Sequence, residues 1–431
     1  MRNTWRSQAC VLAAILLLLA ACIPASSRET DTDTVEAKDE FEAAVEADPA
    51  EQFPLFGPFS KHPVPVLETR VNHSWFCPWH QQQVLWESKD VFNPAVVVTG
   101  SPPSIKVLYR AEDSVGIYSG TSRIGLAESL DGTTFPDELR RTRPVLYPEP
   151  TECCQRHYHP TDACRKSCAE LGWESEPMLG AIEGEGGCED PRVVQDGESG
   201  EFLLTYTCYD GRTARLCIAT SKDLEPETWV KHGLAFPQYP DAWSKAASIV
   251  SRYLPDAPPV AARCGPGSRY YMFWGEGHIK IATSDNLRKW VPLEGAAHSP
   301  TDRWAGGFLQ PRPQKWDSEL VEAGPPAALI GEYIVLIYNG KNARKGGDRS
   351  LAAGTYAPGQ VVVSAMDPEK VLYRAPLPLL VPDQPFEIQG QVNRVVFVQG
   401  LALFREKWLL YYGTADSLIA VASAPDHPYL R

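Results

Sequence analysis

Two acids stand side by side in the motif GCEDPRVV, and their setting suits them to proton transfer. Glycines let the backbone turn tightly before Glu189 and Asp190, and the proline that follows fixes the next φ angle. The valines after it are typical of the buried start of a strand, so both carboxylates are expected at a strand mouth. A carboxyl group held there is a candidate general acid. The alternative for an isolated EDPR is a turn whose acids face water.

Other polar residues occupy similar places, before buried strands or at the ends of the strands that follow them. They are Asn93, Arg110, Glu112, Asp113, Arg192, Asp210, Glu276, His278, Glu322, Asn339 and Asp416. Carboxylates interleaved with Arg, His and Asn favour a polyol ligand, because sugar hydroxyls need both donors and acceptors. Glycosidic cleavage also needs a proton donor. The sequence contains no Gly-rich phosphate loop, HExxH helix or GxSxG elbow.

The elements that position these residues recur along the chain. One strand type contains the alanines Ala127, Ala219, Ala282, Ala353 and Ala422, in segments such as LCIATSKDL and IKIATSDNL. A second type keeps step with it and starts with NPAVVV, EDPRVV, PPVAARC, GPPAALI and NRVVFVQG. Two patterns at one period indicate internal repeats. Trp229 and Trp290, which follow DL and NL turns, are predicted to pack between repeats.

Each repeat contains about four short strands, with further ones at 106–112, 202–210, 270–276, 333–340 and 408–416. Four-stranded units repeated radially form a β-propeller, so the fold class is predicted to be all-β, a five-bladed β-propeller. The first strand of each blade lines the central channel, and the polar residues before those strands should therefore converge on one pocket.

Ten motifs in order resemble glycoside hydrolase family 130. They are FNPAVVV, VLYRAEDS, SRIGLAESLDG, GCEDPRVV, LTYTCYDGRTARLCIATS, YMFWGEGHIKIATS, LVEAGPPAALI, IYNGKN, PLLVPDQPFEIQGQVNRVVF and LYYGTADS, spanning roughly residues 90–425. The resemblance implies a five-bladed propeller that cleaves β-mannosides with inversion, either as a phosphorylase that releases mannose 1-phosphate or as a hydrolase.

The resemblance also implies roles for single residues. Asp190 matches the general acid of the family, and Asn93, Arg110, His278 and Asp416 match positions that grip the sugar. Structural roles are the alternatives, such as an ion pair for Arg110 or a packing role for His278. From their strand positions, Asp113, Arg192 and Asn339 are further substrate-binding candidates.

Hydrolysis is favoured over phosphorolysis because the chain carries an export signal, and a sugar phosphate released outside the cytoplasm is lost. A phosphate co-substrate would need cations, for which Arg215, His278, Lys280 and Lys341 are candidates. A hydrolase needs a base at roughly 6.5–9.5 Å from the acid, and Glu276 and Glu322 are candidates. Both acids could instead bind sugar hydroxyls. No metal or other cofactor is expected.

Two other functions remain open on the same fold. One is a surface lipoprotein that binds carbohydrate without cleaving it, which the intact acid disfavours. The other is an arabinanase-like or invertase-like glycosidase, and FNPAVVV lacks the aspartate with which the invertase type begins. A net charge of −13 argues against a nucleic-acid partner.

The N-terminus reads as a targeting signal. Residues 1–22 combine Arg2 and Arg6 with an apolar stretch and end in LAAC, which resembles a bacterial lipobox with Cys22 as the lipidated residue. The acidic segment 23–52 is predicted to be a disordered linker, and residues 53–431 the catalytic domain. The protein is therefore expected to be exported, as an outer-membrane or periplasmic lipoprotein anchored to the membrane, or otherwise secreted.

Nine cysteines follow Cys22, and in an exported protein they are expected to form disulfides. Four crowd into 153–168, inside a cysteine-rich insert at about 150–176, where zinc is the alternative. Cys188, beside the acid pair, is predicted to be disulfide-bonded. Nine is an odd number, so at least one thiol should stay free or pair outside the chain.

Overall fold

The computed structural model describes residues 52–115, 120–149, 180–293 and 307–430. The chain divides into two units, Met1–Glu46 and Ala47–Arg431, and every described residue belongs to the second. The predicted signal peptide, Cys22, the linker up to residue 51 and the cysteine-rich insert lie outside the described residues. Within them, no helix has the length and apolar character needed to cross a membrane.

The described part of the second unit is all-β, as predicted. Its α-helices, α2 (Gly180–Glu183) and α3 (Pro385–Ile388), have four residues each. The 3-10 turns are η2 (Asp137–Leu139), η4 (Pro226–Thr228) and η5 (Pro428–Leu430). Alternating and fully apolar runs of Val, Ile, Leu and Tyr account for the strands, since such residues pack well on a pleated surface.

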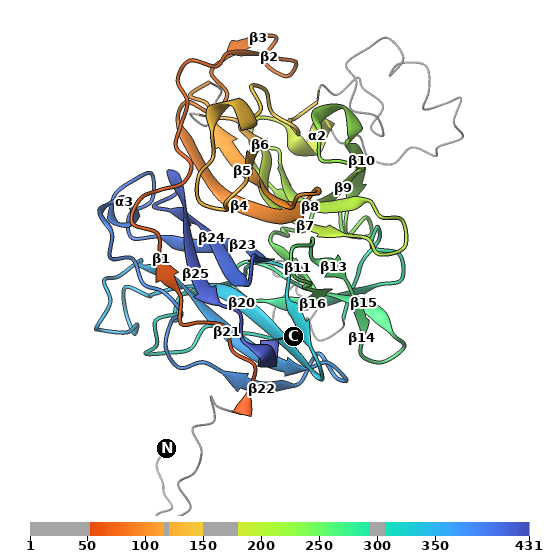
Figure 1. Ribbon diagram of the computed structural model, residues 1–431, viewed down its shortest axis with the longest axis vertical. Coiled ribbons are helices and arrows are strands. Elements are labelled where there is room, and N and C mark those ends of the chain that lie inside the picture. The colour runs from red at the N-terminus through yellow and green to blue at the C-terminus, as the bar shows by residue number, and fades with distance from the viewer. Residues whose placement is uncertain (1–51, 116–119, 150–179, 294–306, 431) are drawn as a thin grey trace, which may run out of the picture. The chain divides into compact units, whose positions relative to one another are not determined.

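The strands form successive antiparallel groups along the chain (Figure 1). Group 1 contains β4 (Asp90–Thr99), β5 (Ser104–Glu112) and β6 (Ser122–Ser129). Group 2 contains β7 (Gly187–Gln195), β8 (Phe202–Tyr209), β9 (Ala214–Ser221) and β10 (Val230–Leu234). Group 3 contains β11 (Ala247–Ile249), β14 (Arg263–Cys264), β15 (Arg269–Trp274), β16 (Lys280–Ser284) and β17 (Val291–Pro292).

Two further groups complete the series. Group 4 contains β18 (Leu320–Ala323), β19 (Ala328–Ile330), β20 (Tyr333–Lys341), β21 (Tyr356–Ser364) and β22 (Val371–Arg374). Group 5 contains β23 (Val396–Phe404), β24 (Lys407–Thr414), β25 (Leu418–Pro425) and the N-terminal β1 (Ser60–Lys61). The short strands β2 (Trp75–Cys77) and β3 (Gln82–Val84) pair with each other, and β12 (Ser251–Arg252) pairs with β13 (Val260–Ala261).

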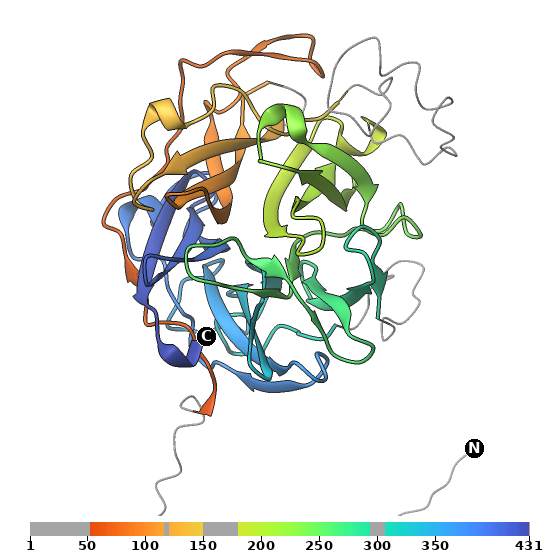
Figure 2. The same ribbon diagram turned by 45° about the vertical axis from the view of Figure 1, so that its right-hand side comes forward.

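The first strands of the groups lie toward a common centre (Figure 2). Strand β4 contacts both β7 of the next group and β23 of the last group, and β7 contacts β11. Five apolar clusters fill the spaces between consecutive groups, and one of them joins group 5 back to group 1. The polar ends of the first strands are therefore brought to one place.

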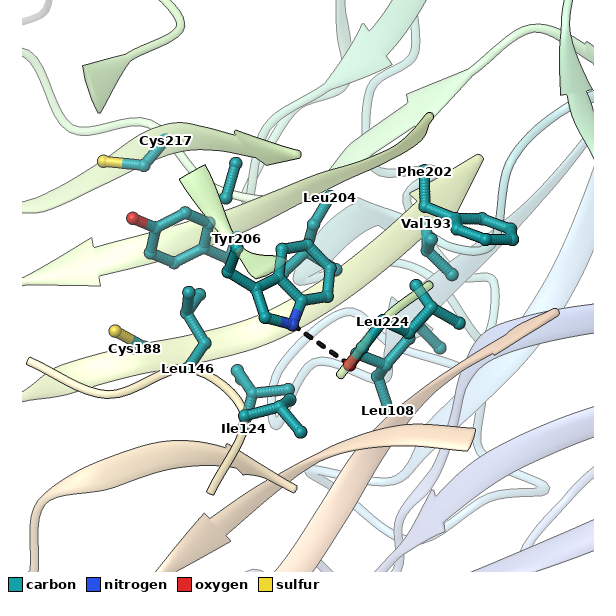
Figure 3. Packing of buried hydrophobic residues seen from close by; sticks show 14 of the residues in the cluster. Leu108, Ile124, Leu146, Cys188, Val193, Phe202, Leu204, Tyr206, Cys217 and Leu224 are labelled. Carbon is teal, nitrogen blue, oxygen red and sulfur yellow. Dashed lines mark hydrogen bonds between the residues drawn. The ribbon is translucent and has the colours of Figure 1, made fainter. Parts of the chain in front are cut away.

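Figure 3 shows the cluster between groups 1 and 2, where Leu108 and Ile124 face Val193, Leu204 and Tyr206. Trp229 is buried in the same cluster, and its Nε1 donates a hydrogen bond of 3.2 Å to the carbonyl oxygen of Leu224. Trp290 is fully buried in the next cluster and donates to the carbonyl oxygen of Leu287. The prediction that both tryptophans pack between repeats is confirmed.

Two landmarks of the predicted repeat were wrong. The first strand of group 3 starts at Ala247, and the PPVAARC segment forms β13 and β14 after it. In group 4, Ala353 lies in the loop that precedes β21. In both places the sequence that resembles the repeat is displaced along the chain from the strand that occupies the corresponding position, so the pattern marked the wrong residues.

A buried polar cluster recurs in four of the groups. In each, a tyrosine of one long strand (β5, β8, β20 or β24) donates its hydroxyl to a carboxylate that precedes the first strand of the group, and a cation contacts that carboxylate. The clusters are Tyr109–Glu87–Arg140, Tyr206–Glu183–Lys231, Tyr338–Asp317–Arg374 and Tyr412–Glu387–Lys61. The last cation, Lys61, comes from β1, so the two ends of the described chain meet in group 5.

Candidate active site

A pocket opens where the first strands converge, with a volume of about 120 Å³. Four carboxylates, two cations, an amide and four apolar or aromatic residues line it. They are Asp190, Glu276, Glu322, Asp416, Arg110, Lys245, Asn93, Phe92, Tyr356, Val395 and Phe397. Six of the predicted site residues therefore line one pocket: Asn93, Arg110, Asp190, Glu276, Glu322 and Asp416.

Asp190 lies on a bulge of β7, where the pairing with β8 shifts between Glu189 and Arg192. Its φ is 51°, in the left-handed region that asparagine and aspartate tolerate better than most residues. The bulge re-aims the side chain away from the regular alternation of the strand. The EDP motif thus places a carboxylate at the pocket, and its position is set by the backbone.

Asn93 occupies the matching place on β4, with a φ of 51° and a register shift between Phe92 and Ala95. Its Nδ2 donates a hydrogen bond of 2.6 Å to Oδ1 of Asp190. Its Oδ1 is buried and has no hydrogen-bond partner among the described residues. A buried acceptor without a partner is costly, so this oxygen is available to a ligand hydroxyl.

Arg110 joins the acids across groups 1 and 2. Its Nη1 lies 3.1 Å from Oδ1 of Asp190, and its Nη2 lies 2.7 Å from Glu112 and 3.0 Å from Glu189. The guanidinium also stacks over the Phe92 ring at 4.7 Å. The ion pair that the sequence suggested as an alternative role for Arg110 is present, and the same side chain lines the pocket.

Lys245 approaches from group 3 and was not predicted from the sequence. Its Nζ lies 3.3 Å from Oδ2 of Asp190 and 3.9 Å from Oε2 of Glu189. It precedes Ala246, whose φ is 49°, and then β11, so it is the strand-mouth residue of its group. The sequence reading placed that mouth at Pro258, and Lys245 was missed for that reason.

The adjacent acids Glu189 and Asp190 share the cations Arg110 and Lys245. Burial alone would raise the pKa of Asp190, but the charges of Lys245, Arg110 and Arg192 outweigh it and hold this pKa below its ordinary value. Burial raises the pKa of Glu189 to about 7. Near pH 7 Glu189 is therefore partly protonated, while the cations favour the charged form of Asp190.

Glu322 of β18 and Glu276 of the β15–β16 loop form a second pair of acids at the pocket. Burial and then the negative charge of Glu276 raise the pKa of Glu322 to about 8. Glu276 is more exposed, and its Oε2 accepts a hydrogen bond of 3.1 Å from Nε1 of Trp243. At neutral pH Glu322 therefore keeps its proton.

Asp416 follows β24 and has a φ of 51°. Burial raises its pKa to about 7, against the opposing charge of Arg110. The aromatic ring of Tyr356 and the apolar side chains Val395 and Phe397 form the remaining wall. Polar groups set against an apolar wall are typical of a site for a small polar ligand.

Other predicted site residues stabilise the strands around the pocket. Asp113 is buried against Arg123, at 2.7 Å from its Nη1. Arg192 donates to the carbonyl oxygens of Ala323 and Gly324, which ties group 2 to group 4. Neither Asp113 nor Arg192 is among the residues that line the pocket.

Three more candidates have similar roles. The side chain of Asn339 is fully buried and makes two hydrogen bonds with the backbone of Val398, which ties group 4 to group 5. Arg215 contacts Asp210 at 2.7 Å and the carbonyl oxygen of Pro240. Lys280 donates to the carbonyl oxygen of His278. Arg215, His278 and Lys280 are all absent from the lining of the pocket.

The prediction of a disulfide at Cys188 was wrong. Cys188 is a buried free thiol, as are Cys77 and, with partial exposure, Cys264. Cys188 lies opposite Cys208 in the sheet, but Cys208 is bonded to Cys217 on the next strand. The predicted disulfides of 153–168 fall outside the described residues.

Comparison with known proteins identifies a family that this chain resembles. Residues 178–428 match the family model Glyco_hydro_130, described as beta-1,4-mannooligosaccharide phosphorylase. This match covers the strands from β7 to β25, together with most of the residues that line the pocket.

Individual relatives resemble the chain over most of its length. A glycosyl hydrolase from Bacteroides ovatus is 35% identical, with a TM-score of 0.72, over 88% of this chain and 98% of the relative. A GH130 structure, described with the statement that this family of mannoside phosphorylases contains glycoside hydrolases that target β-1,2 mannosidic linkages in Candida mannan, is also 35% identical. Its TM-score is 0.72, over 88% of this chain and 99% of the relative. A 1,2-β-oligomannan phosphorylase from Thermoanaerobacter sp. is 29% identical over 78% of this chain and 90% of its own.

Proposed function

This chain belongs to glycoside hydrolase family 130, and on that premise we propose that it hydrolyses β-mannosides with inversion, using water as the nucleophile. Membership of the family makes the protein a glycoside hydrolase or phosphorylase that acts on β-mannosidic linkages. The non-catalytic binding protein considered above is therefore set aside. Under the proposal, the five strand groups are the blades of a five-bladed propeller, and residues 53–431 form its catalytic domain.

The charge of the pocket is the main observation that favours water over phosphate as the nucleophile. Its lining contains four carboxylates and two cations, Arg110 and Lys245, and both cations already contact Asp190. A phosphate dianion needs cations that are free to receive it, and carboxylates beside it repel it. Three of the four cations proposed for phosphate are engaged elsewhere: Arg215 with Asp210, Lys280 with a carbonyl oxygen, and Lys341 with Glu319. The fourth, His278, is not among the residues that line the pocket.

Asp190 is proposed as the general acid. Inverting cleavage requires an acid that protonates the leaving oxygen. The pKa of Asp190 lies below its ordinary value, so the proposal requires Asp190 to take up a proton before it acts, and the adjacent Glu189 is the proposed source. Glu189 supplies a proton store next to it, because its pKa is about 7 and Arg110 and Lys245 contact both carboxylates.

The roles of the two acids across the pocket can be assigned from their charges. Glu276 is proposed as the base that activates water, since its negative charge helps to raise the pKa of Glu322. Glu322, with a pKa of about 8, is proposed to donate a hydrogen bond to water or to a sugar hydroxyl. Asn93, Arg110 and Asp416 are proposed to hold the sugar.

A β-1,2 linkage is proposed for the substrate. Two relatives are named for this linkage, a 1,2-β-oligomannan phosphorylase and a β-1,2-mannobiose phosphorylase. The description of the GH130 structure above also names β-1,2 mannosidic linkages as the target of hydrolases in the family. The phosphorylase alternative, which would release mannose 1-phosphate, is favoured by the names of those two relatives. The lining of the pocket disfavours it.

Export as a lipoprotein completes the proposal. Residues 1–22 support it through the charged start, the apolar stretch and the LAAC sequence. A disulfide between Cys208 and Cys217 is consistent with an oxidising compartment. Labelling with a fatty-acid analogue, lost on Cys22→Ser, would support lipidation and the proposed periplasmic or outer-membrane location. Labelling that persists in the variant would contradict it.

One experiment tests the reaction itself. The protein is incubated with β-1,2-mannobiose and with β-1,4-mannobiose, with and without inorganic phosphate, and the products are followed by NMR. We expect free mannose, released first as the α-anomer, from the β-1,2 substrate at a rate independent of phosphate. Accumulation of mannose 1-phosphate, or acceleration by phosphate, would establish phosphorolysis instead.

A further inference from the structure

The loop 342–355 joins β20 to β21 at the wall of the active-site pocket. Its two flanking residues, Lys341 and Tyr356, are register partners, and Tyr356 lines the pocket. The Nζ of Lys341 lies 5.4 Å from the centroid of the Tyr356 ring. The loop therefore begins and ends at the site, on the same end of the strands as Glu276 and Asp416, which lie in the corresponding loops of groups 3 and 5.

Three cations project from this loop, and the described part of the chain supplies no acidic partner for them. Arg344, Lys345 and Arg349 are exposed, and within the described residues none of them forms a salt bridge. The one acid of the loop, Asp348, accepts hydrogen bonds from the backbone N and hydroxyl of Ser350. Such a local excess of positive charge stands out in a chain of net charge −13.

The loop is held in one shape from inside. The Nδ2 of Asn342 donates to the carbonyl oxygens of Asp348, Leu351 and Ala352, and its Oδ1 accepts from the backbone N of Asp348. A Cβ at Gly347 would lie 2.3 Å from that Oδ1, so glycine is required there. A fixed loop has already lost the conformational freedom that binding would otherwise cost.

A second cavity lies against the loop, separate in its lining from the active-site pocket. Its volume is about 520 Å³, compared with about 120 Å³ for the pocket. Asn342, Arg344, Asp348, Arg349 and Gln314 are among its lining residues. Two of the three cations, Arg344 and Arg349, therefore face a space large enough to hold a ligand group.

We propose that loop 342–355 forms an outer binding site for an anionic group, a phosphate or a carboxylate, carried by the mannoside beyond the sugar in the pocket. Arginine binds both groups with two parallel hydrogen bonds, and the loop presents two arginines and a lysine. The inference rests on the proposed function only in taking a mannoside as the carrier of the anion.

Binding measurements test the site independently of turnover. In an Asp190→Asn background, isothermal titration compares β-1,2-mannobiose with two analogues, one with a phosphate monoester at O6 of the reducing-end sugar and one with a C6 carboxylate there. The test variant combines Arg344→Gln, Lys345→Gln and Arg349→Gln. The control combines Lys370→Gln, Arg405→Gln and Lys407→Gln, which changes the net charge equally at exposed positions at the opposite ends of the strands.

We expect the anionic analogues to bind about tenfold more tightly than mannobiose at low ionic strength, as charge-assisted hydrogen bonds allow. The test variant should lose this preference and bind mannobiose with unchanged affinity, and the control should keep the preference.

A preference for one of the two analogues identifies the anion. Equal binding of all three ligands, a preference that survives in the test variant, or an equal loss in the control would each overturn the inference. If wild type cleaves β-mannobiose but shows no preference for the analogues, the outer site fails while the proposed function stands. If the anionic analogues bind more tightly but wild type cleaves no β-mannoside, the outer site stands while the proposed function fails.

Discussion

The ammonium of Lys245 lies 3.3 Å from Oδ2 of Asp190, so a fixed cation faces the proposed acid before any substrate arrives. The same ammonium lies 3.9 Å from Glu189, and together with Arg110 it balances the two adjacent carboxylates. The protonation states of Glu189 and Asp190 therefore depend on Lys245, a residue that belongs to none of the sequence motifs.

Replacing Lys245 by Met should move the basic limb of the pH profile of kcat/KM to higher pH. The cation lowers the pKa values of Glu189 and Asp190, so its loss raises them and the pair keeps its proton to higher pH. The wild-type limb is expected near pH 7, the pKa of Glu189. Lys280→Met, which removes a lysine that does not line the pocket, should leave the limb in place. A limb unmoved in Lys245→Met would contradict the coupling.

Asp190→Asn should keep the fold and lower kcat on β-1,2-mannobiose by about 10²–10⁴-fold, the usual contribution of general acid catalysis. A 2,4-dinitrophenyl β-mannoside needs little protonation of its leaving group, so the loss on that substrate should be much smaller. The two substrates are compared in steady-state assays, with circular dichroism as the check on folding. Equal losses on both would mean that Asp190 is not the acid.

Glu276→Gln should slow hydrolysis more than Glu322→Gln. A pKa of about 8 keeps Glu322 protonated at neutral pH, so a neutral amide mimics it, whereas the proposed base at Glu276 loses its charge. Azide should restore activity to Glu276→Gln and yield α-mannosyl azide, because a small anion can replace the activated water. The order of the two losses, read from kcat at pH 7, decides the assignment, and the reverse order refutes it.

The buried clusters make a separate prediction about stability. Tyr206→Phe should cost about 1–2 kcal/mol, since it removes a hydrogen bond to the buried Glu183. Glu183→Gln should cost about 3–5 kcal/mol, because it leaves the charge of Lys231 buried at 2.7 Å from a neutral group. Denaturant unfolding measures both, with the exposed Tyr429→Phe as the control. Equal costs for the three variants would contradict a structural role for the cluster.

The sequence predicted the strands and the convergence of their polar ends, because a repeated pattern survives wherever the repeats are regular. That reasoning placed Asn93, Asp190 and Asp416 together. It did not find Lys245, whose segment DAWSKAAS matches no repeat and whose strand is interrupted after Ile249. Nor did it separate the residues that line the pocket from those, such as Asn339, that link neighbouring strand groups. The direction of a side chain at a strand mouth depends on bulges and on the neighbouring groups.

The four recurring clusters also lay beyond prediction. Their members are separated by tens of residues, and in the last one Lys61 and Glu387 come from opposite ends of the described chain. A pattern read along the sequence does not report such a pairing, since it depends on how the strand groups close on each other.

The pairing of β1 with β25 has a consequence for biosynthesis. Group 5 obtains its outermost strand and the partner of its buried Glu387 from residues made first, while β23, β24 and β25 are made last. During vectorial synthesis or passage through a translocation channel, the early segment has to wait unpaired until the final strands emerge. The last native contacts thus form only after the whole chain has left the ribosome or the channel, and a truncation near the C-terminus would leave the leading segment without its partner.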